Sequence, residues 1–225
     1  MISRFSRPKG SSAYRIRIKQ LVWDICEQAA RWAGDPIEPQ AYQAIELSPP
    51  DLWHEAFIEH LSILLRPKVY VELGLYKCRV FNRVIPYAEH LVGVDTDCDV
   101  VKLMALSEKT KFVNSTTEDF VQKLTTDPIA VDMLFIDADH AKDSVLRDFF
   151  GILPFVSQHG LILLHDTHPK SVDYLDPQYC NDAYKAIEEL SKRMDQFEMM
   201  TIPLHPGLTL CRKRTSQLSW LEQPT

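Results

Sequence analysis

Acidic and imidazole side chains directly follow several short apolar runs of this sequence. If these runs are strands of a sheet, the side chains lie at its carboxyl edge. Asp95 ends one run, Asp137 a second, and His165 and Asp166 a third. Two further runs also have polar ends, at Glu72-Leu73-Gly74 and at Asn114-Ser115-Thr116. Turn chemistry alone explains any single case, because Asp and Asn are common turn formers. All of them together indicate one ligand-binding edge, since ligands of open α/β sheets bind beyond the carboxyl ends of the strands.

The residue types at these ends indicate which ligand would suit the edge. An acid at the position of Asp95 can accept hydrogen bonds from two ribose hydroxyls, and Gly74 lets backbone approach a ligand closely. A dinucleotide site would need G-x-G-x-x-G after the first run, and the chain offers only Gly74 there. The site therefore suits a nucleoside without phosphates, and S-adenosylmethionine (SAM) fits that description.

The elements that must position these groups alternate between apolar runs and longer helical stretches. Continuous apolar strands between helices predict a parallel sheet covered on both faces. The predicted strands are Val69–Leu73, Leu91–Val94, Phe112–Val113, Met133–Ile136 and Leu161–Leu164. A helix at about Asn181–Met194 then precedes Phe197–Ile202 and Leu208–Cys211, whose short Pro-Gly turn requires antiparallel pairing. We expect an α/β, doubly wound, mostly parallel seven-stranded Rossmann-like sheet with a C-terminal antiparallel hairpin.

The first part of the chain reads as a helical extension of this sheet. Residues 1–66 are predicted to form a basic tail followed by helices, residues 67–215 the ligand-binding domain, and residues 216–225 a tail. One helix is expected from Ile18 to Trp32. A second begins with Ser48 as N-cap and carries an apolar stripe from Trp53 to Leu65. These helices would cap the substrate pocket or form a homodimer contact, two alternatives that the sequence leaves open.

Composition excludes several classes of function. The chain has 225 residues and a net charge of −6, without the overall basic footprint of nucleic-acid binding. No apolar run approaches the length of a membrane span, so no membrane partner is expected. Five cysteines, an odd number without C-x-x-C spacing, favour reduced thiols in a cytoplasmic protein over disulfides or a structural zinc. The low number of glycines, seven, disfavours an all-β sandwich built on glycine hairpins.

Four motifs carry a family resemblance. They are Glu72-Leu73-Gly74, Gly93-Val94-Asp95, Phe135-Ile136-Asp137-Ala138-Asp139-His140 and Gly160-Leu161-Ile162-Leu163-Leu164-His165-Asp166-Thr167. They resemble class I SAM-dependent methyltransferases over roughly residues 68–213, most closely the branch with cephalosporin-hydroxylase-like and macrocin-type sugar O-methyltransferases. The metal-dependent catechol and caffeoyl-CoA O-methyltransferases are more distantly similar. The resemblance implies an enzyme that transfers a methyl group from SAM to a hydroxyl of a small-molecule acceptor.

The resemblance also implies a role for each motif residue. The methionine end of SAM would be lined by Glu72, Gly74 and Leu75, the ribose held by Asp95 and Thr96, and the adenine bordered by Ser115 and Thr116. In the metal-dependent relatives, acids after the fourth and fifth strands hold a divalent cation. The matching residues are Asp137, which also borders the cofactor, and Asp166. The third family ligand is usually Asn and is Thr167 here, so His165 would supply a ligand to Mg²⁺ or another divalent cation.

The resemblance places a catalytic base three residues after Asp137. The catechol-like relatives have a Lys there, and this chain has His140. An imidazole suits proton transfer near neutral pH. Asp137 and His140 are therefore the predicted catalytic residues.

Two departures from the family pattern keep other functions open. The family loop E-x-G-x-x-x-G has Cys78 at its second glycine, where a side chain is expected to crowd the amino-acid part of SAM. Together with Thr167, this departure allows a non-catalytic SAM- or nucleoside-binding interaction protein. A third hypothesis is a nucleotide-sugar glycosyltransferase with Asp137-Ala138-Asp139 as a metal-binding D-x-D motif. It is disfavoured because it leaves Asp95 and the terminal hairpin unexplained.

Overall fold

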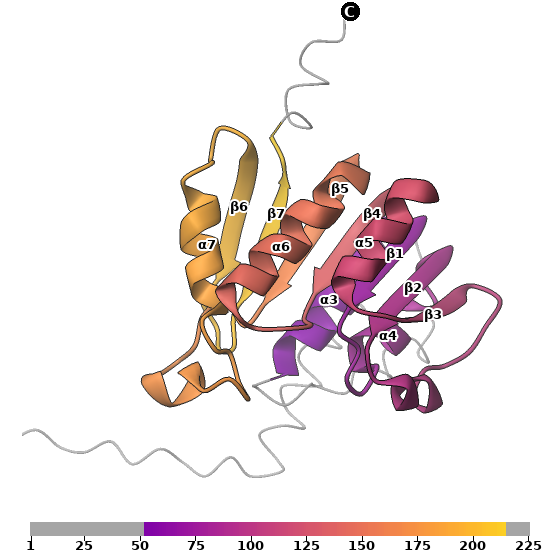
Figure 1. Ribbon diagram of the computed structural model, residues 1–225, viewed down its shortest axis with the longest axis horizontal. Helices are drawn as coiled ribbons and strands as arrows, with labels where there is room; N and C mark the ends of the chain where they lie inside the picture. The colour runs from indigo at the N-terminus through magenta and orange to yellow at the C-terminus, as the bar shows by residue number, and fades with distance from the viewer. Residues whose placement is uncertain (1–51, 215–225) are drawn as a thin grey trace, which may run out of the picture. The chain divides into compact units, whose positions relative to one another are not determined.

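The computed structural model describes residues 52–214, drawn in colour in Figure 1. The predicted basic tail, the helix expected from Ile18 to Trp32, the Ser48 N-cap and the tail at residues 216–225 lie outside the described residues. Everything that the sequence predicted for the sheet and for its carboxyl edge falls inside them.

Seven strands form one mixed sheet in the order β3-β2-β1-β4-β5-β7-β6. The first five strands in this order are parallel, and β7 pairs antiparallel with both β5 and β6. This topology confirms the predicted fold class and the C-terminal hairpin. The bounds are β1 (Val69–Leu73), β2 (His90–Asp95), β3 (Thr110–Asn114), β4 (Val131–Ile136), β5 (Val156–His165), β6 (Phe197–Ile202) and β7 (Leu208–Lys213).

Helices cover both faces of the sheet, as a doubly wound fold requires. In Figure 1, α5 (Thr117–Thr126), α6 (Lys142–Ile152) and α7 (Ala183–Ser191) lie in front of the strands. The longer helix α3 (Trp53–Leu65) and α4 (Arg79–Val84) cover the other face. Short 3-10 turns complete the connections: η2 (Cys98–Lys102), η3 (Leu153–Phe155) and η4 (Val172–Leu175). Each face has its own apolar core, and strand residues alternate between the two.

Helix α3 differs from the predicted apolar stripe. Leu64 is 70% exposed and Leu65 51% exposed. The fully buried residues of the helix are His54, Glu55, Ile58 and Ser62, while Trp53, Phe57 and Leu61 of the predicted stripe are partly buried against the same core. Part of the reason is electrostatic, because Glu55 accepts ion pairs from Arg79 and Arg83 on α4. The helix therefore turns a partly polar face toward the sheet.

The strand register brings the predicted ligand-binding groups to one level. Leu73 of β1 is paired with Val94 of β2 and with Ile136 of β4, and Ile136 is paired with Leu164 of β5. The residues that follow these four positions are Gly74, Asp95, Asp137 and His165. The sheet thus gathers one residue of each motif at its carboxyl edge.

Two features of the described residues bear on the predictions from composition. Cys78, Cys98, Cys180 and Cys211 are free thiols. No helix in residues 52–214 combines the length and the apolar character needed to cross a membrane.

Candidate functional site

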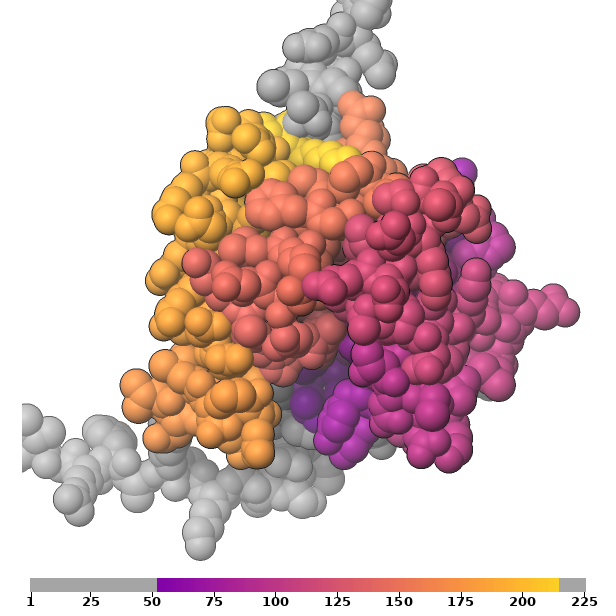
Figure 2. Space-filling view, in the orientation of Figure 1, coloured from indigo at the N-terminus to yellow at the C-terminus, as the bar shows by residue number. Residues whose placement is uncertain are grey.

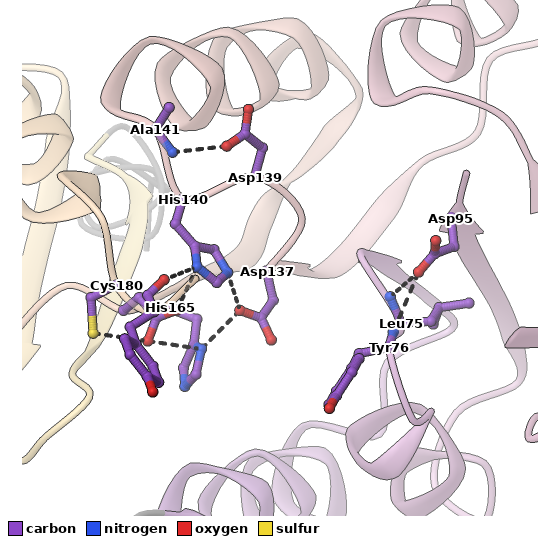
Figure 3. A network of polar contacts seen from close by, with 11 residues as sticks. Leu75, Tyr76, Asp95, Asp137, Asp139, His140, Ala141, His165 and Cys180 are labelled. Carbon is purple, nitrogen blue, oxygen red and sulfur yellow. Dashed lines mark hydrogen bonds and ion pairs between the residues drawn. The ribbon is translucent and has the colours of Figure 1, made fainter. Parts of the chain in front are cut away.

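Three side chains converge just beyond β4 and β5. Asp137 follows β4, Asp166 follows β5, and His140 lies in the loop before α6. Donor atoms of these three residues all lie within 4.8 Å of one another. Figure 3 shows His140 and His165 turned toward Asp137. Two carboxylates and an imidazole so close together form a donor set that suits a divalent cation.

The contacts of His140 fix the roles of its two nitrogens. Nδ1 donates a hydrogen bond to the backbone carbonyl of Tyr179 and lies 3.2 Å from Asp166 Oδ2. Nε2 lies 3.6 Å from Asp137 Oδ1. A carbonyl can only accept, so Nδ1 carries a hydrogen, and Nε2 is the atom that gains or loses a proton. Because Tyr179 contributes only its backbone, its part in the site carried no sequence signal.

His165 lies on the other side of the same carboxylates. Its Nδ1 is 2.8 Å from Asp137 Oδ1 and 3.6 Å from Asp166 Oδ1. Burial lowers the pKa of His165 and of His140, but the neighbouring carboxylates outweigh burial and raise these pKa values to about 10 and about 9. Burial likewise raises the pKa of Asp137 and Asp166, yet the two imidazoles hold both below the usual range. The carboxylates therefore carry negative charge that positive neighbours must balance.

This charge balance predicts how the stability of metal-free protein depends on pH. Both histidines have folded-state pKa values above the ordinary 6.5, so protonation favours the folded state. The stabilisation is fully present below pH 6.5 and is lost as the pH rises through about 9 and about 10. Thermal unfolding in a chelator should show a falling midpoint over this range. The His140→Gln variant should show a smaller fall, whereas a His168→Gln control at an exposed position should behave like the wild type.

Backbone geometry supports a functional role for Asp166. Its φ of +58° lies in the left-handed region, which non-glycine residues adopt mainly where surrounding structure imposes it. Its side chain also contacts the thiol of Cys180, with Sγ 3.4 Å from Oδ1. Thr167, at the family's third ligand position, has its hydroxyl bound by Thr209 of β7 at 2.9 Å. Thr167 is therefore engaged with the hairpin.

A cavity of about 230 Å³ lies beside this cluster. Figure 2 shows the surface hollowed near the lower edge of the molecule, between the orange segment and the purple segments. Predicted site residues Glu72, Leu75, Asp137 and His165 contribute to the cavity, together with Leu52, His54, Glu55, Tyr76, Lys77, Arg79 and Val80. The structure thus brings the β1 and β4 motifs together around one space.

Glu72 is the more deeply buried of the two glutamates that line this cavity. It is 2% exposed, and its Oε2 accepts a hydrogen bond from Tyr70 Oη at 2.5 Å. Burial raises the pKa of Glu72 well above its ordinary value, although the bond from Tyr70 opposes the shift. A buried carboxylate of this kind favours a cationic ligand group.

Asp95 organises the loop next to the cavity. Its Oδ2 accepts the backbone N–H groups of Leu75 at 2.8 Å and Tyr76 at 3.3 Å, and its Oδ1 accepts that of Asp97 at 2.9 Å. Figure 3 shows this loop facing Asp137, with His140 on the far side of Asp137. Gly74 precedes the loop with a φ of +82°, a conformation open to glycine.

The remaining predicted cofactor residues do not line the cavity. Thr96 and Thr116 are exposed and Ser115 is half-buried, all beyond the ends of β2 and β3. The Thr116 hydroxyl caps α5 by accepting the N–H of Asp119 at 3.1 Å. Their predicted contacts with ribose and adenine stay predictions.

Cys78 turns away from the cavity rather than crowding it. The side chain is fully buried in the apolar core beneath α4, and Sγ lies 3.6 Å from the carbonyl oxygen of Val100. Burial raises the pKa of its thiol to about 11, so the thiol is unreactive. The φ of +54° shows that this position still adopts the conformation that glycine prefers.

One cavity residue, His54, escaped the sequence analysis altogether. It is 5% exposed on α3, and its ring centroid lies 4.1 Å from that of His165. Burial and the charge of His165 lower the pKa of His54 to about 3. In the sequence, its only distinguishing feature is a position next to Trp53 in the predicted apolar stripe, which is a weak indication of a functional role.

Comparisons with known proteins agree with this arrangement. Residues 71–167 match the family model of a methyltransferase domain, which confirms the predicted resemblance. A search of curated protein sequences finds no match.

Solved structures share the fold at low sequence identity. The O-methyltransferase of Bacillus cereus in complex with S-adenosylhomocysteine (SAH) has a TM-score of 0.61 at 13% identity, covering 88% of this chain and 97% of the other. The tomaymycin-synthesis O-methyltransferase of Streptomyces achromogenes with SAM has 0.60 at 14%, covering 84% and 88%. The SAH-bound methyltransferase of Podospora anserina has 0.59 at 15%, covering 95% and 100%.

Proposed function

We propose that this chain, whose residues 71–167 match the family model of a methyltransferase domain, is a SAM-dependent O-methyltransferase acting on a small-molecule hydroxyl with the help of a divalent cation. The activity is supported by the domain match and by the O-methyltransferases that share its fold. The small-molecule acceptor is the class implied by these enzymes.

One observation is the main support for metal-assisted methyl transfer. The Asp137, His140 and Asp166 cluster adjoins a cavity that contains Glu72 and that also includes Asp137. Cofactor and acceptor sites would therefore meet at Asp137.

The cofactor end of the site follows from the charges in the cavity. SAM supplies an electrophilic methyl group when it is bound. Glu72 would accept hydrogen bonds from the ammonium group of its methionine moiety. Asp95 would bind the ribose hydroxyls, with Thr96 beside it and with Ser115 and Thr116 near the adenine. Gly74 would allow the backbone to approach the ligand, and Leu75 would pack against it.

The acceptor end follows from the cluster. Asp137 and Asp166 would hold a divalent cation, since their negative charge is balanced in this structure by the flanking histidines. The cation would assist the deprotonation of the acceptor hydroxyl. His140 would take the proton at Nε2, because Nδ1 is bound to the Tyr179 carbonyl. His165, bonded to Asp137 at 2.8 Å, would position that carboxylate or add a ligand nitrogen.

The alternatives are not favoured. A D-x-D motif would need Asp139 in the metal cluster, yet Asp139 accepts the N–H of Ala141 at 3.0 Å and the hydroxyl of Ser144 at 2.6 Å. Asp139 is therefore engaged with residues at the start of α6. The non-catalytic hypothesis rested on Cys78, whose side chain is buried in the core, and on Thr167, whose hydroxyl is bound by Thr209.

Calorimetric titration tests the proposed function directly. Purified protein should bind SAM and SAH but not a nucleotide sugar, with and without Mg²⁺. Turnover is then measured across a panel of phenolic and sugar hydroxyls. Absence of heat with both sulfur nucleosides contradicts the proposal, whereas binding without any turnover favours the non-catalytic hypothesis.

The Asp166→Asn variant separates the metal from the cofactor. Asn tolerates the left-handed backbone of this position, so the fold should be retained. We expect the Mg²⁺ dependence of turnover to disappear and the activity to fall by about 100-fold. SAM affinity should stay within about twofold of wild type, because Asp166 does not line the cavity. Collapse of SAM binding in this variant would show that Asp166 has been misassigned.

A further inference from the structure

His54 has a buried nitrogen with no use in the chemistry described so far. Its Nδ1 has no hydrogen-bond partner among residues 52–214, although the residue is only 5% exposed. Leaving a buried polar atom unpaired is costly. The same side chain contributes to the wall of the 230 Å³ cavity, so a ligand bound in the cavity would lie next to His54.

Two polar groups of the cavity, Glu72 and His54, suit ligand groups of opposite charge. Glu72 presents a buried carboxylate, which suits an ammonium group. His54 presents an imidazole nitrogen that can donate a hydrogen bond, which suits a carboxylate. An α-amino acid in its zwitterionic form carries both groups.

Two cationic side chains of the cavity are engaged elsewhere. Arg79 is half exposed and lies 3.4 Å from the Glu55 carboxylate. Lys77 Nζ lies over the ring of Tyr76, 5.0 Å from its centroid. Two histidines of the cavity wall, His54 and His165, each have a buried nitrogen without a partner among the described residues. His165 is held beside the carboxylates of Asp137 and Asp166 through its other nitrogen, so His54 is the better candidate for a ligand carboxylate.

The size and position of the cavity indicate which part of a ligand it holds. A volume of about 230 Å³ is smaller than sites for whole drug-sized molecules, which run from about 300 Å³ upward. Asp95, the predicted ribose acceptor, lies at the loop of Leu75 and Tyr76 and is not part of the cavity wall. The cavity therefore suits the end of the cofactor away from the nucleoside.

We propose that His54 of α3 binds the carboxylate of the methionine moiety of SAM through Nδ1, opposite Glu72, which binds the ammonium group. This inference rests on the proposed function. It assigns α3, which precedes the sheet and falls before the matched methyltransferase domain, a direct part in cofactor recognition.

A pair of ligands that differ only by the carboxylate tests this contact. Titrations compare SAM with decarboxylated SAM, which keeps the nucleoside, the sulfonium and the ammonium group. The wild type should bind SAM about tenfold more tightly than decarboxylated SAM. His54→Ala should bind both equally, with affinity for decarboxylated SAM unchanged within about twofold.

Two further variants make the result specific. His54→Phe keeps a ring against His165 and should behave like His54→Ala. His60→Ala removes an exposed histidine of the same helix and should keep the wild-type preference for SAM. Circular dichroism of each variant monitors folding.

The outcomes separate this inference from the proposed function. Equal losses for both ligands in the His54 variants would show a purely structural role and overturn the inference. Unchanged SAM affinity in these variants would overturn it as well. If the wild type binds neither SAM nor SAH, the proposed function itself fails. Loss of discrimination confined to the His54 variants supports both.

Discussion

The Gly74→Ala variant is expected to lose about 2–4 kcal/mol of unfolding free energy and to bind SAM at least about 100-fold more weakly. Gly74 has a φ of +82°, and an added Cβ would lie 2.3 Å from the carbonyl oxygen of Asp137 and 2.6 Å from the Cα of Ala138. Both are backbone atoms, so no side chain can rotate to make room. Either β1 or the end of β4 must move, and Asp137 moves with it.

The measurement combines thermal or denaturant unfolding with calorimetric titration of SAM. Gly151→Ala serves as the matched control, because Gly151 lies within α6 and an added Cβ would meet the side chain of Val121 at 3.0 Å. There Ala also gains helix propensity, worth about 1 kcal/mol relative to Gly. The control should therefore stay within about 1 kcal/mol of wild type. A Gly74→Ala protein with wild-type stability and SAM affinity would rule out the close approach of β1 and β4.

The Asp137→Asn variant is expected to lower turnover by about 1,000-fold. Asp137 contacts both His140 and His165, and it is one of the two carboxylates proposed to hold the cation. Asn keeps the size and one acceptor oxygen but removes the charge. The cation should bind at least about 100-fold more weakly, measured by calorimetry with Mg²⁺ or Mn²⁺, a readout independent of any acceptor.

Two variants make this result interpretable. Asp127→Asn removes an exposed acid at the end of α5, away from the cluster, and should leave turnover and cation binding unchanged. His140→Gln should lower turnover but leave the cation affinity close to wild type if His140 is the base. Loss of cation binding in His140→Gln would make His140 a third ligand instead. Wild-type turnover in Asp137→Asn would contradict the proposed site.

Much of the fold was predictable because local pattern and tertiary structure agree there. The apolar runs of β1, β2 and β4 are buried on both faces, so their composition marks them as strands without reference to any partner. The Pro-Gly turn after Ile202 forces the last two strands to be antiparallel, and β6 and β7 pair in this way. Strand edges were less well defined: β5 runs from Val156 to His165, longer than the predicted Leu161–Leu164.

Helix α3 shows where the pattern was insufficient. Periodicity predicted that Leu64 and Leu65 would face the core, yet both are exposed. The buried face carries His54 and Glu55 because the helix packs beside the site and pairs with arginines of α4. Hydrophobicity cannot predict burial of a polar side chain whose partners are distant in the sequence.

Cys78 is a second residue whose surroundings could not be predicted from the sequence, because it was expected near the cofactor and lies in the core. The family pattern led to the expectation of a side chain in the cofactor space. The left-handed backbone at this position instead directs the thiol into the core beneath α4. Side-chain direction depends on φ and ψ, which a one-letter pattern does not record.

The sequence by itself determined the strands, the polar residues that follow them and the residues able to carry the chemistry, because these depend on residue type and short-range spacing. Only the tertiary structure decided which of these residues meet. Strand register placed Asp137 level with Gly74 and Asp95, and the left-handed turn at Asp166 brought it to His140. The packing of α3 added His54 to the cavity. These contacts join residues up to about a hundred positions apart, and only packing across the sheet brings such residues together.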